Sequence, residues 1–281
     1  MEVKVLDALM GSGKTTKLIN DVSLLPNDRP VIYIAPLLSE CHRFAGTQTD
    51  EEGDIVVDDN GQPVYENHHP LACKAFKHPS NKNRRGTKLE SLTQAVGMGK
   101  NIVSTHSLFR MMNEDITGKI KEKGYTLIID EVLCVWEKYT INKGNSDTAD
   151  LDSTDTDKEI ASLISSGIIE VDPCGVLHWQ WDKFSVVEGT HYEETATLCD
   201  TKQLFMANGT VVLWEYPLWV LEAFKEVWIA TYMFESSFMS EYFKLHGIEY
   251  KIERFGKKPT DYKHLVTLVE DLKLNACGEK P

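Results

Sequence analysis

The sequence predicts an α/β fold in which a mostly parallel central sheet is flanked by helices. Three apolar runs, at residues 31–35, 126–129 and 227–232, are rich in β-branched residues and have the length of buried strands. Helix-favouring stretches separate the early runs, and strands that alternate with helices pair in parallel. Another apolar run, at residues 3–8, leads into a glycine-rich turn and then into the first of these stretches.

The remaining elements of this fold follow in order along the chain. We expect five strands to share one parallel sheet, at residues 3–8, 31–35, 101–105, 126–130 and 227–232. We expect helices at residues 14–25, 37–44, 89–96, 107–112 and 237–246, and Gly247 follows the last of them as a C-terminal stop.

Two insertions interrupt this order, at about residues 46–86 and 140–215. In the first, an Asp-Asp-Asn-Gly turn between two apolar segments predicts a hairpin. In the second, the polar residues 142–158 predict a mobile loop, which is followed by a helix at 160–164 and strands at 168–171 and 211–214. We expect one domain over residues 1–252, which contains both insertions, followed by a segment at residues 253–281.

The composition is that of a globular protein. A chain of 281 residues, with 42% hydrophobic and 26% charged residues, can form one large domain. It has neither the roughly 18 consecutive apolar residues of a membrane helix nor a signal-peptide pattern, so we expect a cytoplasmic protein with no membrane partner. The net charge of −13 does not exclude nucleic-acid binding, because six bases and no acid lie within residues 71–88.

A glycine-rich loop predicts a nucleotide-binding site. Residues 8–15 read Ala-Leu-Met-Gly-Ser-Gly-Lys-Thr, which fits the pattern of a phosphate-binding loop. Such a loop needs small residues, because its backbone N–H groups must converge on phosphate oxygens at the start of a helix. We expect ATP to contact Met10, Gly11, Ser12, Gly13, Lys14, Thr15 and Thr16. Lys14 would reach the β- and γ-phosphates, and the Thr15 hydroxyl would bind Mg²⁺.

Two adjacent carboxylates predict the second half of this site. Asp130 and Glu131 directly follow the apolar run at residues 126–129. In a phosphate-loop ATPase the first carboxylate holds Mg²⁺ and the second orients the attacking water. Two acids after a strand are common at ordinary strand-to-helix turns. The pair therefore indicates a nucleotide site only in combination with the loop at Lys14.

These motifs resemble the first RecA-like domain of the superfamily 2 helicases, and in particular phage-encoded DNA helicases related to herpesvirus-type origin-binding proteins. Residues 8–16 look like motif I of that group, with Leu9 where proline is usual. Residues 34–36 and 103–108 resemble segments that the family places beside the nucleic-acid strand. Residues 129–131 match motif II. Thr231, after Ala230, stands for the end of motif III, which couples the ATP site to the bound strand.

The resemblance implies a RecA-like P-loop NTPase that uses Mg²⁺ with ATP and binds single-stranded or duplex DNA. The catalytic residues would be Lys14, Asp130, Glu131 and Thr231. Residues expected to contact nucleic-acid phosphates are Ser39, Arg43, Thr105, Ser107 and Arg110, with the basic run from Lys74 to Lys88 as an outer electrostatic guide. A helicase of this kind also needs a second RecA-like domain, in cis or in trans, to provide an arginine finger. The resemblance therefore implies that residues 253–281 begin a missing or truncated second domain.

The sequence therefore favours the ATP-hydrolysing motor domain of a DNA helicase or translocase that acts in phage DNA replication or recombination, in the host cytoplasm. Two alternatives stay open. Thymidine-kinase-like nucleoside kinases have a similar loop and a similar Ile-Asp-Glu strand end, but they also carry a CxxC zinc ribbon that this sequence lacks. A non-catalytic nucleotide-binding interaction module is the other alternative.

Overall fold

The computed structural model describes residues 1–59, 63–80, 87–141 and 153–256. Its centre is a six-stranded sheet in which every neighbouring pair is parallel. The strand order is β11 (Lys251–Arg254), β1 (Glu2–Asp7), β10 (Glu226–Thr231), β4 (Thr126–Asp130), β2 (Val31–Ala35) and β3 (Ile102–Thr105). The five strands expected from the sequence are confirmed as members of one sheet. The sixth, β11, extends that sheet two residues past the domain boundary expected at residue 252, and residues 257–281 lie outside the described part.

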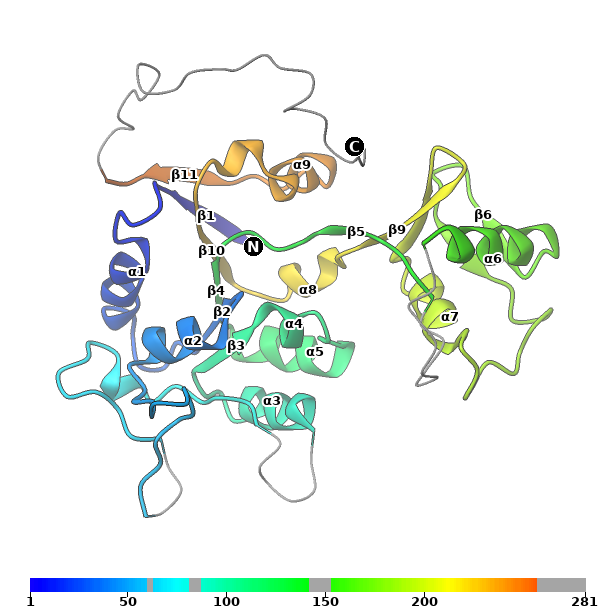
Figure 1. The fold of residues 1–281 in the computed structure, drawn as a ribbon. Helices are drawn as coiled ribbons and strands as arrows, with labels where there is room; N and C mark the ends of the chain where they lie inside the picture. Colours follow the sequence, from blue (N-terminus) through cyan, green and yellow to red (C-terminus); the bar gives the residue numbers. More distant parts are fainter. Residues whose placement is uncertain (60–62, 81–86, 142–152, 257–281) are drawn as a thin grey trace, which may run out of the picture.

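Helices cover both faces of this sheet (Figure 1). Residues alternate between the two faces along a strand, so Tyr33 on β2 joins one apolar core while Ile32 and Ile34 join the other. Helices α1 (Lys14–Ser23) and α2 (Leu38–Ala45) pack on the Tyr33 face. The opposite core receives side chains of α3 (Lys88–Gly97), α4 (His106–Phe109), α5 (Glu114–Lys123), α8 (Leu218–Glu222) and α9 (Phe238–Leu245).

The first insertion packs beside α2 and extends the β3 edge of the sheet. Antiparallel bridges join Thr47 to Tyr65 and Val57 to Pro63, so the expected hairpin pairing is present, although residues 60–62 of its turn lie outside the described part. At the sheet edge, the backbone N–H of Lys77 donates to the carbonyl of Asn101 at 2.8 Å, and Val103 donates back to Lys77 at 3.0 Å. The buried side chains of Leu71 and Phe76 complete the core under α2.

The second insertion forms a lobe to one side of the sheet (Figure 1). Strand β5 (Trp136–Lys138), which begins four residues before the expected start of the insertion, forms an antiparallel sheet with β9 (Val211–Glu215) and β8 (Leu204–Ala207). Strand β6 (Ile169–Val171) pairs with β7 (Leu177–Trp179). The expected strands at 168–171 and 211–214 are confirmed. The expected loop at 142–158 is wrong for residues 153–158, because α6 (Ser153–Ser165) begins at Ser153, and α7 (Glu193–Asp200) was not expected.

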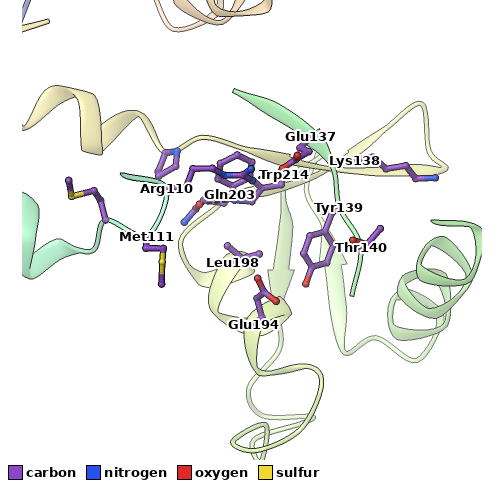
Figure 2. Close-up of a pocket in the computed structure, with 12 residues that line it drawn as sticks. Arg110, Met111, Glu137, Lys138, Tyr139, Thr140, Glu194, Leu198, Gln203 and Trp214 are labelled. Carbon is purple, nitrogen blue, oxygen red and sulfur yellow. Dashed lines mark hydrogen bonds and ion pairs between the residues drawn. The ribbon is translucent and has the colours of Figure 1, made fainter. Parts of the chain in front are cut away.

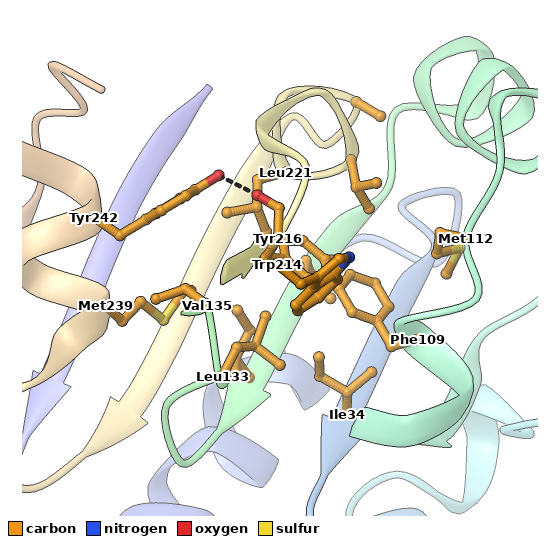
Figure 3. Close-up of a cluster of buried hydrophobic side chains, with 14 of the residues drawn as sticks. Ile34, Phe109, Met112, Leu133, Val135, Trp214, Tyr216, Leu221, Met239 and Tyr242 are labelled. Carbon is orange, nitrogen blue, oxygen red and sulfur yellow. Dashed lines mark hydrogen bonds between the residues drawn. The ribbon is translucent and has the colours of Figure 1, made fainter. Parts of the chain in front are cut away.

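The segments that connect the lobe to the sheet domain are packed in the core of that domain. Tyr216 is fully buried, and its ring stacks against Phe109 of α4 with centroids 6.0 Å apart. The hydroxyl of Tyr242 on α9 donates to the Tyr216 carbonyl at 2.8 Å, and Figure 3 shows these side chains with Val135 in one cluster. Within the described ranges, no helix is long and apolar enough to cross a membrane.

Candidate functional site

The loop between β1 and α1 contains two glycines in the backbone conformation that favours glycine. Gly11 and Gly13 adopt φ values of 71° and 89°, in the left-handed region that favours glycine. A Cβ atom at either position would meet nothing within 4 Å, so the requirement is conformational and not steric. The loop places the N-terminus of the ten-residue helix α1 at the C-terminal edge of the sheet. Backbone N–H groups at such a terminus favour anions.

Lys14 is the first residue of α1 and is buried, with 7% of its surface exposed. Its ammonium donates to the carbonyl of Ala8 at 3.0 Å and to that of Leu9 at 3.4 Å. These contacts hold the ammonium group against the backbone of the loop.

A hydrogen-bonded chain joins the loop to the acidic strand end. Thr15 Oγ1 donates to Asp130 Oδ2 at 3.2 Å, across 115 residues of sequence. The hydroxyl of Tyr33 donates to the same oxygen at 2.6 Å. Tyr33 is fully buried and stacks on Phe44, with ring centroids 3.7 Å apart. Burial raises the pKa of Tyr33 far above its ordinary value, with a further contribution from Asp130, so the phenol remains a donor.

Glu131 turns away from the strand in a strained conformation. Its φ is 64°, which is uncommon for a residue with a side chain. Its backbone N–H donates to the Ala230 carbonyl at 2.9 Å, and its carboxylate accepts a hydrogen bond from Thr231 Oγ1 at 3.1 Å. Both bonds come from the end of β10, which lies between β1 and β4. The two carboxylates therefore have different hydrogen-bond partners, although the two residues are adjacent in sequence.

A cavity of about 470 Å³ lies in front of these groups. Four carboxylates and two cations line it, together with His69 of the first insertion. The charged residues are Glu40, Glu66, Asp130, Glu131, Lys14 and Arg43. Met10, Gly11, Gly13, Thr15 and Thr16 also line the cavity, whereas Ser12 and Thr231 contribute no lining. The structure thus brings together most of the residues expected to contact ATP.

The cavity also contains two oxygen atoms of the kind that magnesium binds. Mg²⁺ prefers oxygen ligands and is usually held by one or two carboxylates together with phosphate oxygens and waters. Thr15 Oγ1 and Asp130 Oδ2 provide such a pair of oxygens, 3.2 Å apart. Among the described residues no group of three or more His, Cys, Asp or Glu side chains could hold a metal by itself, so the phosphates would have to complete the coordination.

The residues expected to contact nucleic acid do not lie together on one surface. Ser39 and Ser107 are exposed on the helices that follow β2 and β3, and Thr105 Oγ1 accepts a hydrogen bond from Leu108 N at 3.5 Å as the N-cap of α4. Arg43 lies in the cavity described above, with a guanidinium nitrogen 3.4 Å from Thr15 Oγ1. Arg110 lies away from it, at the junction with the second insertion.

At that junction Arg110 is engaged on two sides. It pairs with Glu137 at 2.5 Å, and its guanidinium lies 4.2 Å from the ring centroid of Trp214. It lines a second cavity, of about 580 Å³, between the sheet domain and the lobe (Figure 2). A contact between Arg110 and a nucleic-acid phosphate stays a prediction, and the phosphate would have to compete with Glu137 for the guanidinium.

The basic run from Lys74 to Lys88 is not a continuous exposed patch. Lys74 is buried, and its ammonium donates to the Leu25 carbonyl at 2.9 Å, so its expected role as part of an electrostatic guide is wrong. The long apolar stem of lysine allows such burial when the ammonium finds acceptors. Lys82, Arg84 and Arg85 lie outside the described residues.

Comparison with known proteins identifies a relative without an assigned activity. The chain is 28% identical over 266 residues to the SPbeta prophage-derived uncharacterized protein YonV of Bacillus subtilis (strain 168). The match covers 93% of this chain and 56% of that protein, so the chain spans a little over half of the relative's length. No protein-family model matches the chain, and no solved structure matches it significantly.

Proposed function

We propose that this chain is the ATP-binding and ATP-hydrolysing motor domain of a superfamily 2 type DNA helicase or translocase that acts in phage DNA replication or recombination. The observation that carries the proposal is the bond between Thr15 and Asp130, which unites the two halves of the expected site at the C-terminal edge of a parallel sheet. Ligands bind at this edge in open α/β sheets. The prophage origin of the relative is consistent with a phage protein.

The residues take distinct roles in this proposal. Lys14 would exchange the carbonyls of Ala8 and Leu9 for β- and γ-phosphate oxygens. Thr15 and Asp130 would hold Mg²⁺, which neutralises phosphate charge when it is bound. Glu131 would accept a hydrogen bond from the attacking water and orient it towards the γ-phosphorus, while Thr231 fixes the Glu131 carboxylate.

The lining charges support binding of the magnesium complex over the free nucleotide. Four carboxylates against Lys14 and Arg43 leave a formal excess of two negative charges around the cavity. Free ATP is itself an anion and would be repelled, whereas a divalent cation would offset this excess. Unwinding would further require a second RecA-like domain, in cis or in trans, and a DNA strand across the edge that carries Ser39 and Ser107.

Calorimetry with Mg·ATP tests the proposal. The wild-type chain should bind, and Lys14→Ala should weaken binding severely, because the charged contact to the phosphates disappears. Near-wild-type affinity in this variant would overturn the assignment of the loop. Phosphate release measured without DNA, with single-stranded DNA and with duplex DNA, beside transfer of phosphate to thymidine, separates a DNA-dependent ATPase from a nucleoside kinase.

A further inference from the structure

Among the arginines that the structure describes, Arg43 is the one whose charge has no carboxylate partner. Arg29 pairs with Glu226, Arg110 with Glu137 and Arg254 with Glu235. Arg43 makes no ion pair with any residue that the structure describes, although four carboxylates line the same cavity. Its recorded side-chain contact is the hydrogen bond to Thr15 Oγ1 at 3.4 Å. A guanidinium placed in this way is available to an anion that enters the cavity.

The backbone that carries Arg43 is fixed by the first insertion. Helix α2 ends at Gly46, whose φ is 66° and whose N–H donates to the Arg43 carbonyl at 3.3 Å. A Cβ atom on Gly46 would lie 2.2 Å from the His69 ring, so glycine is needed both for this conformation and for this close approach. His69 is held in turn by a hydrogen bond from Leu71 N to Nδ1 at 3.2 Å. The insertion therefore fixes the position of the last turn of α2 beside the cavity.

We propose that Arg43 is a γ-phosphate-contacting residue of the nucleotide site, provided within this chain, and not part of the nucleic-acid path. The inference rests on the proposed nucleotide binding and deepens it. Thr15 is the proposed magnesium ligand, and a divalent cation on its hydroxyl would repel a guanidinium that lies within hydrogen-bond distance. The guanidinium then turns from Thr15 to the adjacent phosphate oxygens, which a planar fork of N–H donors binds in a bidentate way.

The γ-phosphate is the expected partner because of where Thr15 lies. Thr15 would hold the magnesium ion beside the terminal phosphates, as the hydroxyl at this position does in phosphate-loop sites. Arg43 approaches that hydroxyl from α2, the helix after β2, whereas Lys14 approaches from the loop after β1. The two cations would therefore contact the terminal phosphate from different sides. ATP would gain this second cation, and ADP would not.

Titration calorimetry with Mg²⁺ and either ADP or a non-hydrolysable ATP analogue tests the proposal. Arg43→Ala should weaken binding of the analogue by about 10- to 100-fold, the range for loss of a hydrogen bond between charged groups, and leave ADP affinity within about twofold. Arg43→Lys should recover part of the loss, because it restores the charge without the fork. Lys119→Ala on α5 is the matched control, since Lys119 pairs with Asp115 and lines another part of the surface.

The outcomes separate this inference from the proposed function. If the wild type binds both nucleotides and Arg43→Ala leaves their affinity ratio unchanged, the Arg43 assignment is overturned and the proposed function stands. If Arg43→Ala instead weakens binding of labelled single-stranded DNA while nucleotide affinities stay unchanged, the residue belongs to the strand path. A wild-type chain that binds neither nucleotide contradicts both ideas.

Discussion

Replacement of Tyr33 by phenylalanine isolates the hydroxyl that supports Asp130. The phenol donates to Asp130 Oδ2 at 2.6 Å inside a fully buried environment, and phenylalanine retains the ring that stacks on Phe44. A hydrogen bond to a charged group contributes about 1.5–3 kcal/mol. Tyr33→Phe should therefore lower the free energy of unfolding by about this amount, as measured by urea denaturation followed by circular dichroism.

The same variant should also change the magnesium dependence of nucleotide binding. Residues that support a metal ligand typically contribute 10- to 100-fold to metal affinity, because they hold the ligand in position. We expect the Mg²⁺ concentration for half-maximal nucleotide binding to rise by about tenfold or more in Tyr33→Phe. Unchanged stability together with an unchanged magnesium dependence would refute the role of Tyr33.

A second buried tyrosine provides the control for this experiment. The hydroxyl of Tyr125 donates to the backbone carbonyl of Lys100 at 2.8 Å, and the side chain is fully buried outside the cavity lining. Tyr125→Phe should lower stability by about 0.5–1.5 kcal/mol, the range for a neutral hydrogen bond, with no effect on magnesium dependence. An equal magnesium effect in both variants would mean that general loosening of the core, and not the Asp130 contact, is responsible.

Two further predictions concern catalysis and acid stability. Glu131→Gln should keep nucleotide affinity within about twofold but abolish phosphate release, because an amide can neither take a proton from the attacking water nor hold the water through a carboxylate. Undiminished release would assign the water to another residue. Burial lowers the pKa of His78 from 6.5 to about 3, so below pH 6.5 the unfolded chain binds a proton that the folded chain does not. This histidine should therefore lower the stability of the wild type by about 1.4 kcal/mol for each pH unit from pH 6.5 down to about pH 3. His78→Gln should lessen this dependence of the free energy of unfolding on pH, and identical dependences would contradict a ring that stays neutral in the folded chain.

The strands were predictable because burial on both faces leaves a simple signature. Each of the runs at 31–35, 126–130 and 227–232 lies within one residue of an observed strand, since parallel strands covered by helices are apolar at nearly every position. Helix α5 was missed because Glu114–Lys123 is mostly polar and contains Gly118. Its Asn113 cap, which accepts from Ile116 N at 3.0 Å, was a usable signal.

The contacts of Tyr33 and Arg43 in the candidate site could not be predicted, because they depend on strand register and on helix packing. Tyr33 lies in an apolar run, and nothing local distinguishes it from a packing residue. Its hydroxyl reaches Asp130 because β2 lies beside β4 with Tyr33 opposite Ile128, two residues before the acid. The family resemblance alone places Arg43 on a nucleic-acid path. Its placement beside Thr15 results from the packing of α2 on the same face as α1.

Strand β10 explains how the two halves of the candidate site remain aligned. It lies between β1 and β4, so the loop and the acids are two strand spacings apart, or roughly 10 Å of backbone separation. In the proposed site, a phosphate and a cation would lie in the space between these two strand ends. The end of β10 binds both neighbours, because the Thr231 carbonyl accepts from Ala8 N at 3.0 Å and the Ala230 carbonyl accepts from Glu131 N at 2.9 Å. A shift of this one strand would move the start of the loop and the second acid together. In the proposed nucleotide site, Thr231 would therefore link nucleotide binding to the rest of the sheet edge.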